Sequence, residues 1–186
     1  MLPRCLVFAI ALALPVAALA ASPSPSPYAG EASRSIKALS NDEVADYLAG
    51  KGMGLARAAE LNGYPGPAHV LELADQLGLS QEQRERTRSI FERMQADAKA
   101  AGRRLVDEER RLDELFASRD ISPAVLHEAL ESIGLLDAEV REIHLQAHLE
   151  ESRILSDVQA MKYRHLRGYA GHAAGHGDSA GHDHSH

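Results

Sequence analysis

The sequence predicts an all-α protein in which a long antiparallel helical hairpin follows several short helices. Alanine, leucine, glutamate and arginine, which are good helix formers, dominate the 186 residues. The 14 glycines and 8 prolines cluster in a few stretches, which disfavours an all-β fold. Apolar side chains recur at steps of three and four along two long segments, as they do on one face of an α-helix. A chain of this length holds one domain with a core.

The first 20 residues have the pattern of a signal peptide. Residues 1–4 carry positive charge, residues 5–20 are apolar, and Ala18-Leu19-Ala20 forms a small-x-small cleavage pattern before Ala21. An uncleaved membrane anchor is the alternative, but the apolar run is shorter than the ~20 residues that a spanning helix needs, and Pro15 interrupts it. We therefore expect an exported chain that begins at Ala21 and has lost Cys5, the only cysteine, so that thiolate ligands and disulfides are excluded.

Three further segments complete the predicted organisation. Residues 21–39 begin with alternating serine and proline and are expected to form a flexible linker. Residues 40–169 form the helical domain, and residues 170–186 form a glycine- and histidine-rich tail in which no stable helix is expected.

The helical domain opens with short elements. Ser40 and Glu43 form a capping box that begins a helix ending near Ala49, where glycines 50, 52 and 54 break the pattern. A further helical turn is predicted within residues 53–61. Pro67 has the position of a first helical residue, and the helix that it begins is predicted to run to Leu77 and stop at Gly78.

Two long helices are predicted next. The first begins with a capping box at Ser80 and Gln83 and runs to about Phe116. A break over residues 118–122 precedes the second, which restarts at Pro123 and carries an apolar stripe as far as Met161. We expect the two stripes to pair as an antiparallel hairpin.

Three leucines lie off the stripe of the second segment: Leu145, Leu149 and Leu155. A two-helix hairpin cannot bury a second apolar face by itself. The short N-terminal helices could cover this face, a second copy could cover it in a dimer, or it could be an exposed surface for a client protein. Scattered surface leucines are the remaining interpretation.

Composition and motifs exclude several function classes. The formal charge is -7 and no block of lysine and arginine occurs, so a nucleic-acid partner is not expected. There is no P-loop, and Gly52-Met53-Gly54 lacks the strand and helix that a phosphate-binding loop requires. The residue after His144 is Leu145, so the general base of a zinc protease is missing. No enzymatic activity is predicted.

Two five-residue segments, 79–83 and 155–159, both fit the pattern L-[ST]-x-x-Q and flank the predicted hairpin. This pair behind a signal peptide resembles the Spy/CpxP family of periplasmic helical proteins, whose members carry two LTxxQ motifs. The resemblance covers about residues 70–169. Residues 52–67 and 144–169 look most like the CnrX- and ZraP-like branch of periplasmic heavy-metal sensors and resistance proteins.

The resemblance implies a periplasmic helical hairpin that pairs into a curved homodimer and is not an enzyme. Members of the family act as ATP-independent chaperones for unfolded envelope proteins, dampen a sensor kinase, or bind metal and signal through a membrane partner. The metal site of the sensors is not carried over as a whole. Their H-x-x-x-H pair lies in an early helix, whereas this chain has it late, and Met161-x-x-x-His165 reverses their order of His before Met.

His144 and His148 lie one helical turn apart, and Glu151 continues their row at the next turn. Two imidazoles and a carboxylate suit a divalent transition metal such as Zn, Ni, Co or Cu. A solvated helix flank is the equally weighted alternative. His69 and His127 are interpreted as surface residues, and His165 stays unassigned.

The tail offers a second set of possible metal ligands: His172, His176, His182, His184 and His186. Spaced histidines on a glycine-rich chain can wrap an ion at an entropic cost. A solubilising or pH-sensing tail is the alternative. Taken together, we expect a periplasmic, dimeric metal-binding protein in heavy-metal or envelope-stress sensing or resistance, with a membrane-bound sensor kinase or anti-sigma factor as a possible partner. The alternative is a Spy-like holdase for unfolded envelope proteins.

Overall fold

The computed structural model describes residues 26–169, and all of its regular elements are α-helices. The predicted all-α class is therefore confirmed for this part of the chain. The predicted signal peptide and the predicted tail lie outside the described residues. The chain divides into two compact units at residue 32, and the helices all belong to the second. No helix among residues 26–169 is both long and apolar enough to cross a bilayer.

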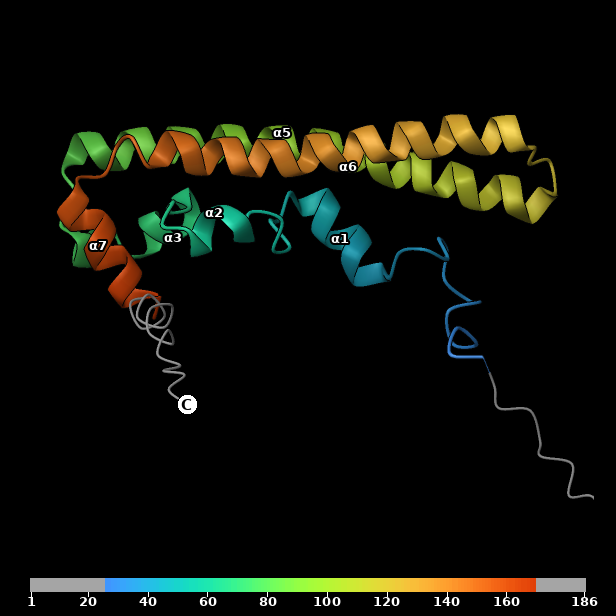
Figure 1. Cartoon of the computed structure of the whole chain (residues 1–186), viewed down its shortest axis with the longest axis horizontal. Coiled ribbons are helices and arrows are strands. Elements are labelled where there is room, and N and C mark those ends of the chain that lie inside the picture. The colour runs from blue at the N-terminus through green and yellow to red at the C-terminus, as the bar shows by residue number, and fades with distance from the viewer. Residues whose placement is uncertain (1–25, 170–186) are drawn as a thin grey trace, which may run out of the picture. The chain divides into compact units, whose positions relative to one another are not determined.

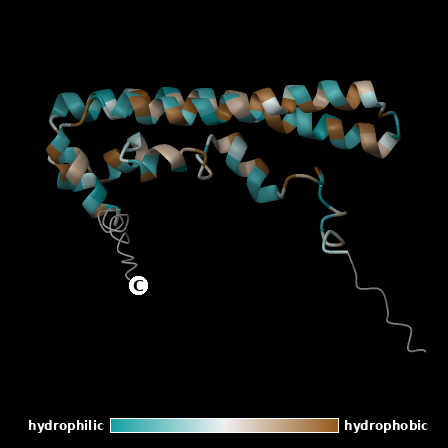
Figure 2. Ribbon diagram, in the orientation of Figure 1, coloured by the Kyte–Doolittle hydropathy of each residue, from teal (hydrophilic) through white to brown (hydrophobic). Residues whose placement is uncertain are grey.

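Two long helices, α5 (Gln81–Ser118) and α6 (Pro123–Glu151), lie side by side and antiparallel (Figure 1). Ser80 and Gln83 form the capping box predicted for α5, and Ser122 caps α6, whose first residue is Pro123. Hydrophobic and hydrophilic residues alternate along both ribbons (Figure 2). Their apolar contact centres on Leu105, Ile133 and Val140, which are almost fully buried.

Four short helices precede this pair: α1 (Asn41–Ala49), α2 (Arg57–Leu61), α3 (Pro67–Glu72) and α4 (Ala74–Leu77). The first and third pack on α5, and the second and third pack on α6. The segment predicted as one helix over 67–77 is interrupted at Leu73, whose backbone leaves the helical region. Leu73 and Val70 pack into an apolar cluster with Leu155, and this contact orients the two halves of the segment.

The packed chain begins before residue 40, the boundary that the sequence suggested. Ile36 is 1% exposed, and the backbone N–H and side chain of Lys37 both contact Asp113 of α5. The end of the predicted linker, residues 33–39, therefore belongs to the helical unit.

The second long segment ends earlier than its apolar stripe predicts. After α6 the chain turns, and a separate helix, α7 (Asp157–Leu166), begins. The helical phase is lost in the turn, so Val158 and Met161 are exposed although the stripe placed them in the core. Leu155 and Tyr163 are buried instead, against α3 and α4.

The two L-[ST]-x-x-Q segments meet in the structure. Each forms a capping box, with Ser80 at the start of α5 and Ser156 at the start of α7. The amides of Gln83 and Gln159 exchange hydrogen bonds of 2.9 and 3.0 Å, and Gln83 also donates to the carbonyl of Ile154. The repeated motif thus fastens the start of α7 to the start of α5.

A candidate metal centre on the buried face of α6

The buried face of α6 changes from apolar to polar near its C-terminal end. Its first half contributes Ala129, Ile133, Leu136 and Val140, and the same face continues with His144, His148 and Glu151. The three polar residues are 3%, 9% and 0% exposed. The solvated-flank interpretation therefore does not describe them, because the loop and helix over residues 50–66 cover this part of α6.

A cavity of about 600 Å³ lies between the two long helices and the short helices that cover them. His144 and His148 both line it, so the structure brings the predicted pair to one site. Four further lining residues bear on its chemistry: Met53, Met94, Glu60 and His69.

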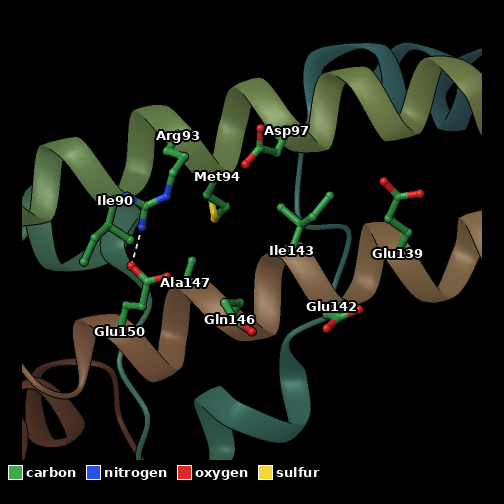
Figure 3. Close-up of a pocket in the computed structure, with 10 residues that line it drawn as sticks. All are labelled: Ile90, Arg93, Met94, Asp97, Glu139, Glu142, Ile143, Gln146, Ala147 and Glu150. Carbon is green, nitrogen blue, oxygen red and sulfur yellow. Dashed lines mark hydrogen bonds and ion pairs between the residues drawn. The ribbon is translucent and has the colours of Figure 1, made fainter.

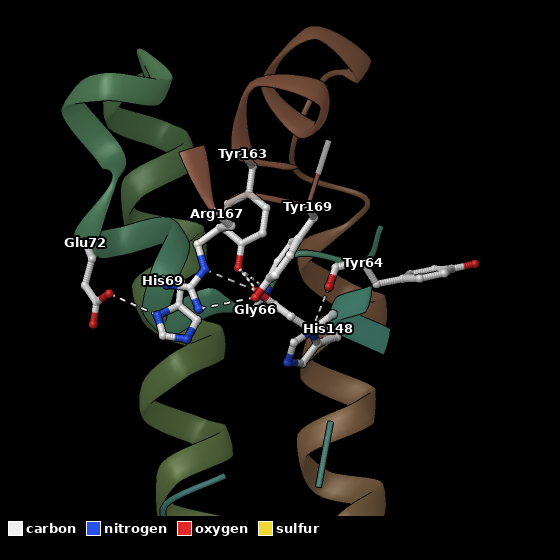
Figure 4. A network of polar contacts seen from close by, with 9 residues as sticks. Tyr64, Gly66, His69, Glu72, His148, Tyr163, Arg167 and Tyr169 are labelled. Carbon is white, nitrogen blue, oxygen red and sulfur yellow. Dashed lines mark hydrogen bonds and ion pairs between the residues drawn. The ribbon is translucent and has the colours of Figure 1, made fainter. Parts of the chain in front are cut away.

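Hydrogen bonding fixes the orientation of His148. Its Nδ1 lies 2.8 Å from the carbonyl oxygen of Tyr64, which can only accept, so Nδ1 carries the proton in the neutral ring (Figure 4). The lone pair is then on Nε2. A Cβ at Gly66 would lie 2.9 Å from this Nε2, so only glycine leaves room for the ring at this point. Backbone carbonyls orient metal-binding histidines in this way in many proteins.

His144 presents an unpartnered nitrogen. Its ring hydrogen-bonds the backbone of Lys51, and its Nδ1 faces Gly52, whereas its Nε2 is buried and has no hydrogen-bond partner. Burial, and secondly the nearby His148, lower the pKa of His144 below its usual value. The ring is therefore neutral at pH 7. A neutral imidazole with a free buried lone pair is the form that binds a metal ion.

Glu151 does not join the two histidines. Its Oε1 accepts a hydrogen bond of 2.9 Å from the hydroxyl of Thr87 on α5, and it does not line the cavity. Burial raises its pKa to about 7. Within residues 26–169 there is no group of three or more His, Cys, Asp and Glu side chains that could hold a metal. The ligand set that the sequence predicted is therefore reduced to the two imidazoles.

A second carboxylate, Glu60 of α2, was not predicted. Its Oε1 accepts a hydrogen bond of 2.6 Å from the hydroxyl of Tyr163 and lies 3.5 Å from Nε of Arg167. Its Oε2 is 3.7 Å from Nδ1 of His148 and has no hydrogen-bond partner. Glu60 thus links α7 to the buried face of α6. No local pattern marks this residue in the sequence, because its partners lie 88 to 107 positions away.

The remaining histidines have different positions. His69 is partly exposed at the cavity and pairs with Glu72 at 3.0 Å (Figure 4). His127 and His165 are exposed. The five tail histidines lie outside the described residues: His172, His176, His182, His184 and His186.

A groove of about 270 Å³ lies between α5 and α6. Arg93 and Glu150 form an ion pair at it, and Figure 3 shows Met94 pointing from α5 toward α6. Met94 is the one residue that lines both this groove and the histidine cavity. Met94 therefore lies at the wall between the two.

Comparison of this chain with protein-family models, with curated proteins and with solved structures finds no match. The resemblance to the Spy/CpxP family consequently rests on the two L-[ST]-x-x-Q segments and their setting in the sequence.

Proposed function

We propose that this protein is a non-enzymatic, periplasmic binder of divalent transition metals that serves heavy-metal or envelope-stress sensing or resistance. Zn, Ni, Co and Cu are the candidate ions. One observation carries the proposal: the buried Nε2 of His144 has no partner, and its ring lines the same cavity as His148. An unpaired buried polar atom costs free energy, so a ligand for that atom explains its retention.

Other parts of the proposal rest on the sequence. The five tail histidines would capture or buffer ions, and the Spy/CpxP resemblance supports a curved homodimer built on the helical hairpin. A membrane-bound sensor kinase or anti-sigma factor would receive the signal. Sedimentation of the exported chain tests the dimer, and a monomer at micromolar concentration would contradict it.

Calorimetric titration of Zn, Ni, Co and Cu tests the cavity. The full chain is used with its five tail histidines replaced by alanine, because the tail would otherwise mask an internal site. We expect saturable binding that the double variant His144→Ala/His148→Ala abolishes. The matched control is His127→Ala/His165→Ala, which removes two exposed histidines away from the cavity and should leave binding unchanged. Binding that survives the first pair of substitutions would refute the site.

A holdase for unfolded envelope proteins is the second candidate, and one observation favours it. Leu149 is 44% exposed, and three other large apolar side chains of the long helices are more than half exposed: Phe116, Leu130 and Leu135. Metal-free protein that suppresses aggregation of an unfolded client, with no effect of chelator, would support this function. Loss of suppression in Leu135→Glu and Leu149→Glu would assign it to this surface.

A further inference from the structure

Two methionine side chains accompany the two histidines at the cavity. The described residues contain three methionines, and two of them, Met53 and Met94, line the cavity with His144 and His148. The third, Met161 on α7, is 63% exposed and lies outside the lining. The two methionines belong to different segments, one to the loop after α1 and one to α5.

The loop that supplies Met53 is strained at that residue. Met53 has φ of +45°, a left-handed conformation that a side chain with a Cβ rarely adopts, and Gly52 and Gly54 flank it. The other non-glycine residue with positive φ among the described positions is Arg119, which ends α5. Helix termination explains Arg119, whereas Met53 ends no helix. Strain of this kind gathers at ligand sites, where it sets the direction of a side chain.

Two carboxylates, Glu60 and Glu72, also line the cavity. Oε1 of Glu60 accepts the hydroxyl hydrogen of Tyr163. Oε2 of Glu60 has no hydrogen-bond partner and lies 3.7 Å from Nδ1 of His148, which donates to the carbonyl of Tyr64. Glu72 pairs with His69 at 3.0 Å. Because residues 26–169 contain no group of three His, Cys, Asp and Glu side chains that could hold a metal, the remaining donors for an ion at the cavity are two imidazoles and two thioethers.

This donor set distinguishes between metals. Structural zinc sites have four His, Cys, Asp or Glu ligands and catalytic zinc sites have three, which is more than the two imidazoles supply. Thioethers are soft, and among the first-row metals they select copper in its monovalent state. On the basis of the proposed metal function, we propose that the cavity is a copper(I) site, with Met53 and Met94 as ligands beside His144 and His148.

The test is a competition for copper(I) under anaerobic conditions. The full chain with the five tail histidines replaced by alanine competes with bicinchoninate for Cu(I), and zinc affinity is measured on the same samples by calorimetry. We expect Met53→Leu and Met94→Leu each to weaken Cu(I) binding at least tenfold and to leave zinc affinity unchanged. Met161→Leu, the control for the loss of a thioether, should change neither affinity.

One further measurement keeps the test decisive. X-ray absorption at the copper edge of the Cu(I)-loaded chain should show sulfur scatterers, which Met53→Leu reduces; this readout does not depend on the fold surviving substitution of the buried Met94. The copper(I) proposal would be overturned if the methionine variants bound Cu(I) unchanged and only His144→Ala/His148→Ala lost Cu(I) and the other metals. The proposed metal function would then stand. Metal binding that survives the histidine substitutions would overturn both.

Discussion

The two halves of the α5–α6 pair bury equivalent faces of the helices with different side chains. Toward the loop at residues 119–122, Leu105, Ile133 and Leu136 form an apolar contact. Toward α7, the face of α6 carries His144, His148 and Glu151. Thr87 of α5 lies opposite Glu151 and donates a hydrogen bond to it. Apolar side chains are stable in the interior without hydrogen-bond partners, whereas buried imidazoles and carboxylates need such partners.

The loops that cover the polar half supply hydrogen-bond partners for its histidines. The carbonyl of Tyr64 and the backbone of Lys51 satisfy one nitrogen of each histidine. The second nitrogen of His144 is left without a partner, as is one oxygen of Glu151. The first half of the pair is therefore built for stability, and the second half holds buried polar atoms that stability alone does not require.

The largest expected effect is in the apolar half. Leu105 is 1% exposed, and Leu105→Ala should lower the free energy of unfolding by about 3 kcal/mol because it leaves a cavity among packed side chains. Metal binding by the folded variant should not change. Urea denaturation measures the stability, with Leu135→Ala as the control, because Leu135 is 67% exposed and its truncation should cost less than about 0.5 kcal/mol. Equal losses in the two variants would contradict the described core.

The polar half should show a pH dependence that the apolar half lacks. Burial raises the pKa of Glu151 from 4.5 to about 7. The folded protein thus retains a proton that the unfolded chain loses, so this group's contribution favours folding below pH 4.5 and declines as the pH rises to 7 and above. The shift corresponds to about 3 kcal/mol over that window.

Glu151→Gln tests this dependence, because the amide cannot titrate but still accepts from Thr87. Urea denaturation between pH 4 and pH 8 should show a flatter stability profile for the variant. Burial also raises the pKa of Glu109 and Asp137, and the difference between the two profiles removes their contribution since both proteins contain them. Glu150→Gln is the neighbouring control, and it should keep the decline seen in the unsubstituted protein.

A smaller effect tests how closely the short helices approach. Gly102 of α5 lies under α1, and a Cβ there would come within 2.5 Å of the carbonyl oxygen of Tyr47. A Cβ at Gly134 of α6 would have no other atom within 4 Å. Gly102→Ala should destabilise by about 1–2 kcal/mol, because the clash exceeds the gain in helix propensity. Gly134→Ala should stabilise by up to about 1 kcal/mol. Thermal unfolding distinguishes the two signs, and a stabilising Gly102→Ala would show that α1 does not pack here.

The sequence predicted the helix boundaries well where caps define them. A serine hydroxyl oxygen accepts a hydrogen bond from the backbone N–H three residues ahead at Ser40, Ser80 and Ser122. Each cap is therefore complete within one helical turn. The end of α6 was misplaced because the apolar spacing continues through the turn at residues 152–156 into α7. Local spacing carries no information on the direction in which the chain leaves a turn.

The candidate site was predicted only in part, for the same reason. The spacing of His144 and His148 on one helix fixes their common face, and the structure places both at one cavity. The spacing also put Glu151 in that row, but the carboxylate of Glu151 accepts a hydrogen bond from Thr87, which lies 64 positions earlier in the chain. Met53 and Glu60 belong to segments whose position over α6 no local pattern specifies.

What the sequence by itself determined is the set of local features: the helices, their caps and the faces on which residues lie. These depend on hydrogen bonds and side-chain spacing within a few residues. The tertiary structure alone decided which faces are covered, that Gln83 meets Gln159, and that two methionines join the two histidines. Those contacts join residues far apart in the chain, and they form only when burial of apolar surface brings the short helices onto the long pair.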